Sequence, residues 1–335
     1  MTLTPVELLR QNAPATRPII ALSEGNDPRI TKGAINAQRA NLADIILVGP
    51  YAEVEAALKD QGAAASRGVE IHDPKTSDLT EEFAEAFFEL RQHKGVDRAK
   101  ARAAVETPPV YAAMLVRSGR ATGTVGGAVH TTGEIVRAAI QVIGMAPDAG
   151  MVSSFFLMYP PENAQPGARA MLYSDCGLVI NPTASELSKI AIASATSART
   201  LLQVDPKIAM LSFSTKGSAK HPDVDKVIEA TEALRQAAPD LNVDGELQFD
   251  AAFVPSVGER KSPGSSVAGQ ANVMIFPNLD AGNIGYKITQ RLGGYTAIGP
   301  VLQGLAKPAN DLSRGCSAED VTQMIAVTAL QANGL

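Results

Sequence analysis

Short apolar runs alternate with amphipathic segments along the whole chain. Continuous apolar runs bounded by polar residues are typical of strands in a parallel sheet that has helices on both faces. The alternation therefore predicts an α/β protein in which layers of helices cover largely parallel strands. Six runs are long and apolar enough to be strands: Pro18–Ser23, Asp44–Val48, Gly150–Met158, Ile208–Phe213, Ala271–Phe276 and Ala297–Leu302.

Three of the segments between these runs begin with the signals of a helix N-terminus. Thr80 is followed by two acidic residues and then by an apolar face that starts at Phe83, and acidic side chains stabilise the first turn of a helix. Thr183 and Glu186 have the spacing of a capping box. Pro222 suits the first position of a third helix. These signals predict helices where the alternation requires them.

The length of the chain indicates more than one domain. A chain of 335 residues is too long for one typical core, and a content of 45% apolar and 19% charged residues is that of a packed protein. The stretches that most resemble linkers, rich in proline and glycine, are Met145–Gly150 and Tyr159–Gly167. A domain boundary near residue 148 is therefore predicted.

The net charge and the absence of long apolar runs exclude several kinds of partner. A formal net charge of -5 argues against a general nucleic-acid surface and against an anionic-membrane surface. No apolar run approaches the roughly 20 residues that cross a bilayer, and the N-terminus lacks the basic start and apolar core of a signal peptide. We therefore expect a cytoplasmic protein with no nucleic-acid partner and no membrane partner.

Cysteine and histidine are too scattered to indicate a disulfide framework or a transition-metal site. Cys176 and Cys316 lie far apart in the sequence, so a reducing compartment is the simpler interpretation. The histidines show neither the HExxH motif nor another ligand spacing.

The glycine motifs of two familiar phosphate sites are missing. The phosphate loop GxxxxGKS/T is absent, and the glycines at 123, 126 and 127 do not have the GxGxxG spacing of a dinucleotide site. We therefore expect no metal and no cofactor. Because both phosphate loops are missing, any anion must be bound by side chains and by other turns.

The polar segment 310–320 carries the most informative candidates. Arg314 can hold a phosphate through two N–H groups, and Asp320 can accept a proton. Ser317 is expected to be the N-cap of a helix over Val321–Gln331, which places Asp320 at the third position after the cap. From the residues alone, capping is the favoured role of Asp320.

A glycine-rich segment over residues 123–132 ends in Thr131 and Thr132. Its glycines allow a ligand to approach the backbone, and the two hydroxyls can donate to a phosphate or an oxyanion. Arg137 lies one to two turns into the helix that follows. The plainer interpretation is a tight strand-to-helix turn with an N-capping threonine and with Arg137 on a solvated face.

Two further segments carry polar residues close to predicted strands. Ser214 and Lys216 come directly after a predicted buried strand, and ligands of α/β sheets collect at the carboxyl ends of strands. Asn283 suits a turn entering a helix, and Tyr286 and Arg291 follow it. An ordinary polar loop and a surface arginine explain the same residues. Together, the four segments place hydroxyl-rich and glycine-rich turns close to arginines, which suits a phosphorylated substrate.

Long strings in the sequence resemble the phosphate acetyltransferase family: VGGAVHTTGEIVR, LSFSTKGSAKHPDVDKV, DGELQFDAAFVP, NVMIFPNLDAGNIGYKITQRLGG and AIGPVLQGLAKPANDLSRGCS. The resemblance extends from about Leu22 to the C-terminus. It implies two α/β domains with a cleft between them, in a fold like that of isocitrate and isopropylmalate dehydrogenases. The first domain would be residues 1–148 with 303–335 and the second 149–302, with a homodimer formed through the second.

The resemblance also implies an activity, the reversible transfer of an acetyl group between acetyl phosphate and the thiol of coenzyme A. Asp320 matches the acid that deprotonates the thiol, Arg314 the arginine that holds the phosphoryl group, and Ser313 the neighbour of that arginine in the cleft. The thiolate would attack the acetyl carbon directly in a ternary complex. Coenzyme A, acetyl phosphate and phosphate would then be the partners, with coenzyme A as a substrate rather than a cofactor.

Three more arginines match the pattern of the family. Arg137 and Arg291 correspond to arginines of the active site, and Arg91 corresponds to one associated with coenzyme A. Gly126 departs from the pattern, because many relatives have serine there, and a hydroxyl contact is lost. The other polar residues expected to bind substrate are Thr131, Thr132, Ser214, Lys216, Asn283 and Tyr286.

Three alternatives share these motifs. A phosphate butyryltransferase would differ mainly in its acyl pocket. A non-catalytic module that senses acyl-CoA is the second, although Ser313, Arg314 and Asp320 are all present. A covalent route is the third, with an acetyl group carried by Cys316, but no histidine lies near Cys316 in the sequence. A small buried thiol at a helix start is the plainer interpretation of Cys316.

Overall fold

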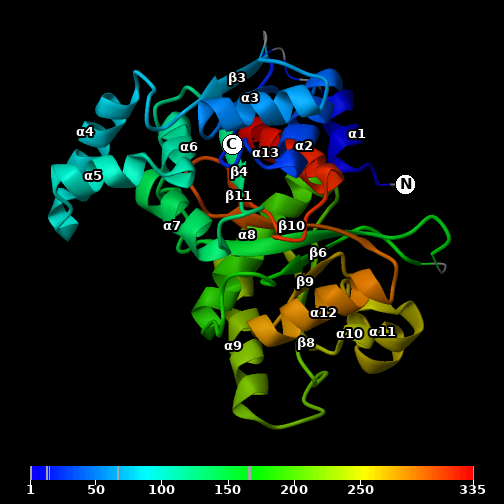
Figure 1. Cartoon of the computed structure of the whole chain (residues 1–335). Helices are drawn as coiled ribbons and strands as arrows, with labels where there is room; N and C mark the ends of the chain where they lie inside the picture. The colour runs from blue at the N-terminus through cyan, green and yellow to red at the C-terminus, as the bar shows by residue number, and fades with distance from the viewer. Residues whose placement is uncertain (1, 13, 15, 66–67, 165–166, 335) are drawn as a thin grey trace. The chain divides into compact units, whose positions relative to one another are not determined.

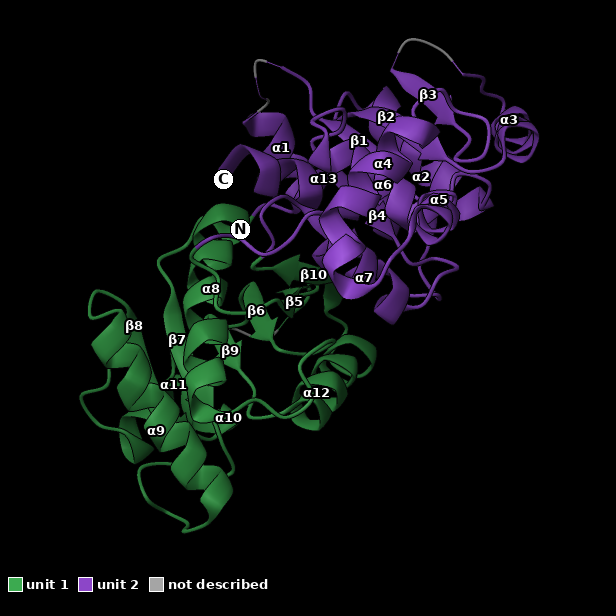
Figure 2. Ribbon diagram, turned by 90° about the vertical axis from the view of Figure 1, so that its left-hand side faces the viewer, with its two compact units in different colours: residues 1–2, 148–304 green, residues 3–147, 305–335 purple. Residues whose placement is uncertain are grey.

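The computed structural model describes the whole chain except residues 1, 13, 15, 66–67, 165–166 and 335. It divides into two compact units, which Figure 2 shows in different colours. Unit 1 contains Asp148–Gly304, and unit 2 contains Leu3–Pro147 together with Leu305–Leu335. The C-terminal segment therefore returns to the unit that contains Leu3–Pro147.

Unit 2 is built on a parallel sheet with the strand order β11-β4-β1-β2-β3. The last strand in the sequence lies at one edge, beside β4, and Asp311 is paired in register with Gly126. This pairing places the start of the C-terminal loop next to the glycine-rich turn. The strands are β1 (Ile19–Leu22), β2 (Asp44–Val48), β3 (Val69–His72), β4 (Gly123–Gly126) and β11 (Ala309–Asp311).

Helices cover both faces of this sheet (Figure 1). Helices α2 and α13 pack together, and α13 contacts β1 and β4, while α6 and α7 pack against the other face. A side chain at Gly123 would meet Thr328 of α13, whereas one at Gly126 would meet Ile135 of α7, as expected for positions on opposite faces of a strand. The helices are α1 (Pro5–Gln11), α2 (Pro28–Arg39), α3 (Tyr51–Asp60), α4 (Thr80–Arg91), the 3₁₀ turn η1 (Gln92–Lys94), α5 (Arg98–Val105), α6 (Pro108–Arg117), α7 (Thr132–Val142) and α13 (Ala318–Gly334).

Unit 1 has a mixed sheet with the strand order β10-β5-β6-β9-β7-β8. Strands β6, β9, β7 and β8 are parallel, while β5 runs antiparallel to both β10 and β6. Its elements are β5 (Ser153–Tyr159), β6 (Met171–Ser174), α8 (Ala184–Leu202), β7 (Lys207–Leu211), α9 (Pro222–Ala237), β8 (Asn242–Leu247), α10 (Phe249–Phe253), α11 (Pro255–Lys261), β9 (Val273–Ile275), α12 (Leu279–Arg291) and β10 (Thr296–Gln303).

The α/β class predicted from the alternation is confirmed. Each of the six apolar runs overlaps a strand, and helices begin at Thr80 and Pro222 as expected. The capping box at Thr183 is present, with its hydroxyl and Glu186 bonded reciprocally. The placement of Asn283 in a turn was wrong, because Asn278 caps α12 by accepting from the Ala281 N–H and the helix is already formed at 283.

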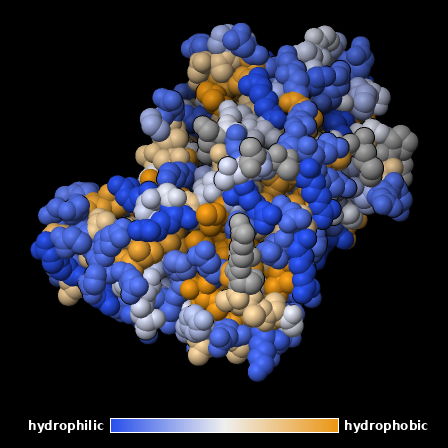
Figure 3. All heavy atoms as spheres, turned by 90° about the horizontal axis from the view of Figure 1, so that it is seen from above, coloured by the Kyte–Doolittle hydropathy of each residue, from blue (hydrophilic) through white to orange (hydrophobic). Residues whose placement is uncertain are grey.

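The surface is mixed in polarity rather than uniformly apolar. Hydrophilic side chains cover much of the face shown in Figure 3, with apolar side chains in separate areas between them. Among the described residues, no helix is both long enough and apolar enough to cross a bilayer.

Candidate functional site

A buried carboxylate organises the turn between β4 and α7. Glu24 is 2% exposed and accepts hydrogen bonds from the backbone N–H groups of Gly127, Ala128, Val129 and His130 at 2.7–3.0 Å. The His130 ring adds a further contact, with Nδ1 2.9 Å from Oε1. Burial acts to raise the pKa of Glu24, but the His130 ring and the backbone donors outweigh it and lower the pKa. The ionised Glu24 thus holds the shape of this turn.

Arg29 joins this turn to the loop that follows β11. Its guanidinium donates to the Ala128 carbonyl at 2.8 Å and to the Arg314 carbonyl at 2.6 Å. Asp27 holds the same guanidinium by an ion pair of 2.8 Å. The turn that carries the two threonines and the loop that carries Ser313 and Arg314 are therefore held side by side.

Asp311 makes a second link between the same two segments. The Thr132 hydroxyl lies 2.6 Å from Asp311 Oδ2, and Asp311 is fully buried. Its Oδ1 has no hydrogen-bond partner among the described residues. Burial, with a smaller contribution from the charge of Glu24, raises the pKa of Asp311 to about 7, while the Thr132 hydroxyl and the Leu312 N–H lower it. The carboxyl of Asp311 can therefore hold or lose a proton near neutral pH.

The predicted residues of unit 2 lie at the ends of these elements. Thr131 is the N-cap of α7 and forms a capping box with Glu134, as the plainer interpretation expected. Arg137 is exposed on the same helix, while Ser313 and Arg314 are exposed in the loop before α13. Arg91 is half-buried as the last residue of α4. Hydroxyl and guanidinium groups thus lie on both sides of the Arg29 link.

Asp320 has the capping position that its spacing predicted. Its Oδ2 accepts from the Ser317 N–H at 2.8 Å and from the Ser317 hydroxyl at 2.9 Å, and the Asp320 N–H donates back to that hydroxyl. Helix α13 accordingly begins at Ala318, earlier than the expected Val321. Asp320 remains half-exposed, so its carboxylate is open to a ligand while it caps the helix.

The beginning of the polar segment differs from the prediction of a continuous polar turn. Asn310 and Asp311 belong to β11 and are fully buried. The Asn310 side chain donates to Thr328 and Gln331 of α13. Strand pairing with β4 satisfies backbone groups of β11, and these side-chain bonds satisfy the Asn310 amide, in place of water. The hydrophobic pattern of the sequence does not reveal such bonds.

In unit 1, Ser214 and Lys216 are bonded within their own region. The Ser214 hydroxyl is fully buried and donates to Glu246 at 2.8 Å. The Lys216 ammonium group pairs with Asp244 and also donates to the Gly245 carbonyl at 3.2 Å. The loop after β7 is therefore stabilised by contacts to β8.

The other predicted residues of unit 1 lie along α12. Asn283 donates to the Cys176 carbonyl at 3.0 Å, and the Tyr286 ring stacks on Phe156 with 4.0 Å between centroids. Burial raises the pKa of the Tyr286 hydroxyl. Arg291 ends the helix and is exposed. Of the predicted residues on α12, Arg291 is therefore the one that presents a charge to solvent.

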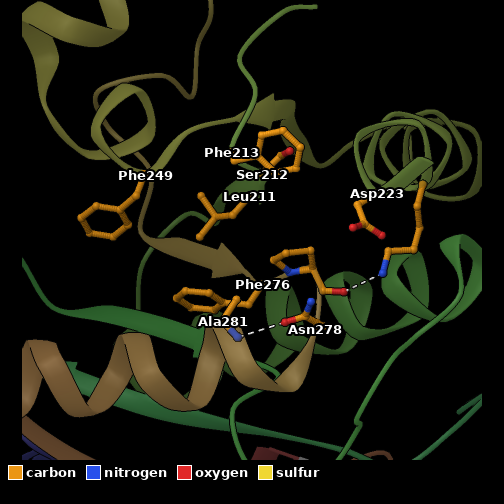
Figure 4. A pocket seen from close by; sticks show the side chains of 10 residues that line it. Leu211, Ser212, Phe213, Asp223, Phe249, Phe276, Asn278 and Ala281 are labelled. Carbon is orange, nitrogen blue, oxygen red and sulfur yellow. Dashed lines mark hydrogen bonds between the residues drawn. The ribbon is translucent and has the colours of Figure 1, made fainter. Parts of the chain in front are cut away.

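A pocket of about 360 Å³ lies at the carboxyl ends of β7 and β9 (Figure 4). Its apolar wall includes Phe213, Phe249 and Phe276, and the Lys226 ammonium group at its rim donates to the Pro277 carbonyl at 2.9 Å. The polar residues predicted in unit 1 are not part of its lining. Within the described part of the chain, no three His, Cys, Asp or Glu side chains are grouped as metal ligands would be.

Comparison with known proteins agrees with the resemblance of the motifs. The profile of the phosphate acetyl/butaryl transferase family matches residues 6–329. The chain belongs to this family.

Relatives in this transferase family match over almost their whole length. A phosphate acetyltransferase of Thermoanaerobacterium thermosaccharolyticum is 46% identical over 328 residues, which are 98% of this chain and 99% of the relative. One from Paracoccus denitrificans is also 46% identical, over 98% of this chain and 99% of the relative. The crystal structure of a phosphotransacetylase from Streptococcus pyogenes has a TM-score of 0.91 and 45% identity, and the match covers 98% of both chains.

Gly126, where the family pattern has serine, lies beside the buried hydroxyl of Ser23. A side chain at Gly126 would begin 2.0 Å from the Ser23 hydroxyl oxygen. Ser23 is 1% exposed, and its hydroxyl has no hydrogen-bond partner among the described residues. The Ser23 hydroxyl therefore fills the space into which a serine at 126 would project.

Sequence reasoning missed Glu24, Arg29 and Asp311 as residues that shape the site. Each lies within the part of the chain, from about Leu22 onward, that resembles the family, and this was the available signal. The partners that link them to the site are at least 99 positions away along the chain. Without the strand register, nothing in the sequence pairs them.

Proposed function

We propose that this protein transfers an acetyl group reversibly between acetyl phosphate and the thiol of coenzyme A. The observation that carries the proposal is the 46% identity to proteins named phosphate acetyltransferase over nearly the full length of both chains. The two linked segments of unit 2 support it, since they combine exposed arginines with threonine and serine hydroxyls. Such groups bind phosphate and stabilise an oxyanion.

In this proposal the chemistry begins with the thiol of coenzyme A. Only the thiolate is a good nucleophile, and a free thiol is mostly protonated at neutral pH. Asp320 removes the proton, and the thiolate attacks the acetyl carbon. Ser313 donates to the carbonyl oxygen as negative charge builds on it, and Thr131 does the same when its hydroxyl hydrogen turns away from Glu134. Arg314 and Arg137 neutralise the departing phosphate.

Binding both substrates in one complex supplies much of the rate in this scheme. Correct orientation of two reactants contributes about 7–11 kcal/mol to lowering a barrier. Arg91 grips a phosphate of coenzyme A. No metal or other cofactor takes part in these steps.

One assay tests the activity. Purified protein is mixed with acetyl phosphate and coenzyme A, and the thioester is followed by its absorbance. Because the family also includes butyryl transfer, butyryl phosphate is assayed in parallel, and a faster rate with it would reassign the acyl group. Binding of acetyl-CoA with no turnover of either phosphate would identify a sensing module instead.

Arg314→Ala is expected to lose activity chiefly through acetyl phosphate. The substitution removes a charge-assisted contact to phosphate, a loss of about 2–3 kcal/mol, while the backbone carbonyl that Arg29 uses remains. Initial rates at varied acetyl phosphate and varied coenzyme A measure the two effects separately. Unchanged kcat and KM for acetyl phosphate would contradict this assignment.

Cys316→Ala is expected to keep most of the activity. Cys316 is 6% exposed, and burial raises the pKa of its thiol to about 11, so little thiolate is present at neutral pH. A direct transfer also predicts intersecting initial-rate lines when both substrates are varied. Parallel lines, together with an inactive Cys316→Ala, would instead establish the acetyl-enzyme route.

A homodimer formed through unit 1 is part of the proposal. Ile284, Ile288 and Leu292 follow one another at four-residue spacing on and just after α12 and are 57%, 53% and 84% exposed. An apolar stripe of this kind suits burial by a second copy. Ile288→Glu is expected to shift the sedimenting species from dimer to monomer, with a folded circular dichroism spectrum, and a wild type that sediments as a monomer would refute the dimer.

A cytoplasmic location also belongs to the proposal. Cys176 and Cys316 are both free and buried. Free cysteines are typical of proteins in a reducing compartment.

A further inference from the structure

The carboxyl group of Asp311 is enclosed by the two segments that carry the candidate phosphate ligands. A side chain at Gly127 would begin 2.1 Å from Asp311 Oδ1, so the turn backbone covers this oxygen directly. The other oxygen, Oδ2, is 2.6 Å from the Thr132 hydroxyl. Ser313 and Arg314 follow Asp311 by two and three residues. The carboxyl is therefore in contact with the α7 turn and continuous with the arginine loop.

The direction of the bond between Asp311 and Thr132 depends on where the proton lies. An ionised carboxylate only accepts, so the single hydroxyl hydrogen of Thr132 must point at Oδ2. When Oδ2 carries a proton, the carboxyl donates to the threonine oxygen, and the hydroxyl hydrogen is free to point elsewhere. Thr132 is half-exposed at the first position of α7, where an anion is favoured by the helix N-terminus.

We propose that Asp311 is a positioning residue for acyl-phosphate binding, because its buried carboxyl decides whether the Thr132 hydroxyl donates inward or to the phosphate of the substrate. The proposal rests on the proposed function, since it takes acetyl phosphate as the ligand of Thr132. Binding then draws one proton from solvent onto Asp311 Oδ2, and release of the ligand returns it.

The surroundings of Asp311 place this exchange in the neutral range. Burial raises its pKa to about 7, and the charge of Glu24 acts in the same direction. Glu24 is itself bonded to His130, whose pKa it raises. Other charged groups lie on the helices packed against β11. Glu134 on α7 and Asp320 on α13 are each bonded to a capping hydroxyl, and Arg137 on α7 is exposed.

The experiment measures binding of acetyl phosphate by calorimetry in the absence of coenzyme A. Because the competent fraction falls as Asp311 ionises, Kd of the wild type is expected to rise about tenfold from about pH 6 to about pH 8. In two buffers of different ionisation enthalpy, the wild type is expected to take up a proton on binding at the higher pH. Asp311→Asn donates an amide hydrogen to Thr132 at every pH, so its Kd should stay low and flat, with no proton uptake.

Three further variants separate this role from a structural one. Thr132→Ser keeps the hydroxyl and is expected to keep the pH dependence, whereas Thr132→Val should bind weakly at every pH. Asp60→Asn changes an exposed aspartate at the end of α3 and should behave like the wild type. These comparisons use the same ligand, so its own ionisation affects all variants equally.

The outcomes separate the inference from the function on which it rests. A wild type that binds acetyl phosphate and forms thioester, yet shows a flat Kd and no proton uptake, overturns the inference alone. The same tenfold rise in Asp311→Asn or in Thr132→Val also overturns it. If Asp311→Asn does not fold, the inference is still tested by proton uptake in the wild type and by the comparison of Thr132→Ser with Thr132→Val. A wild type that neither binds acetyl phosphate nor forms thioester overturns both proposals.

Discussion

Asp320→Asn is expected to lower kcat by about 10²–10⁴, the usual contribution of a positioned general base. Asparagine keeps the shape of the side chain and an oxygen that can accept from Ser317, so the melting temperature should change little. Activity should recover in part as the pH rises, because coenzyme A then ionises in solvent and no longer needs the base. Steady-state kinetics from neutral to alkaline pH, with thermal melts of both proteins, measure these effects.

Ser317→Ala is the matched control for Asp320→Asn. It removes the hydroxyl that bonds to Asp320 but leaves the carboxylate in place. Loss of such a cap typically costs about 1 kcal/mol of stability, and kcat should be largely retained. If Asp320→Asn turns over at nearly the wild-type rate at neutral pH, Asp320 is only a helix cap and another group must be the base.

Glu24→Gln is expected to cost about 3 kcal/mol or more in the free energy of unfolding at neutral pH, because it removes a buried ionised acceptor of several N–H groups. Glutamine has one oxygen, and its amide hydrogens would face the donors of the turn. Since the pKa of Glu24 is lowered from 4.5 in the folded state, the carboxylate stabilises the fold above that pH. This stabilisation is lost as the pH falls through the folded-state value.

Denaturant unfolding at several pH values measures this difference. Glu134→Gln is the matched control, since Glu134 bonds to Thr131 at the start of α7 but is exposed, and it should cost about 1 kcal/mol or less. In folded Glu24→Gln, KM for acetyl phosphate should rise because the turn is no longer held. Equal stability losses in the two variants at neutral pH would show that Glu24 is not the organiser of the turn.

The parts of the fold that were predictable are those set by local patterns. Buried strands such as Asp44–Val48 appear as continuous apolar runs, and the caps at Thr183 and Ser317 follow from residues three positions apart. Strands β4 and β11 escaped prediction because they are short and contain glycine or polar residues. Their place in the sheet is fixed by pairing with distant neighbours, which has no local signature.

The candidate site was predictable only where its residues act through local sequence or resemble the family. Asp320, Ser313 and Arg314 lie in one polar segment, 310–320, and could be named together. Glu24 could not be paired with its turn, because its partner His130 is 106 residues away. The buried carboxyl of Asp311 was hidden for a related reason, since hydrophobic patterning treats an aspartate as a surface residue.

The return of the C-terminal segment to unit 2 has a consequence for the order of events on the ribosome. Strand β11 and helix α13 are synthesised after residues 148–304, and β11 pairs with β4, which was made about 185 residues earlier. Domains generally fold as units during synthesis. All of unit 1 therefore emerges while unit 2 still lacks an edge strand and the helix that covers β1 and β4. The Thr132–Asp311 contact can therefore form, and Arg314 can take its place beside the α7 turn, only after residues 148–304 have been synthesised.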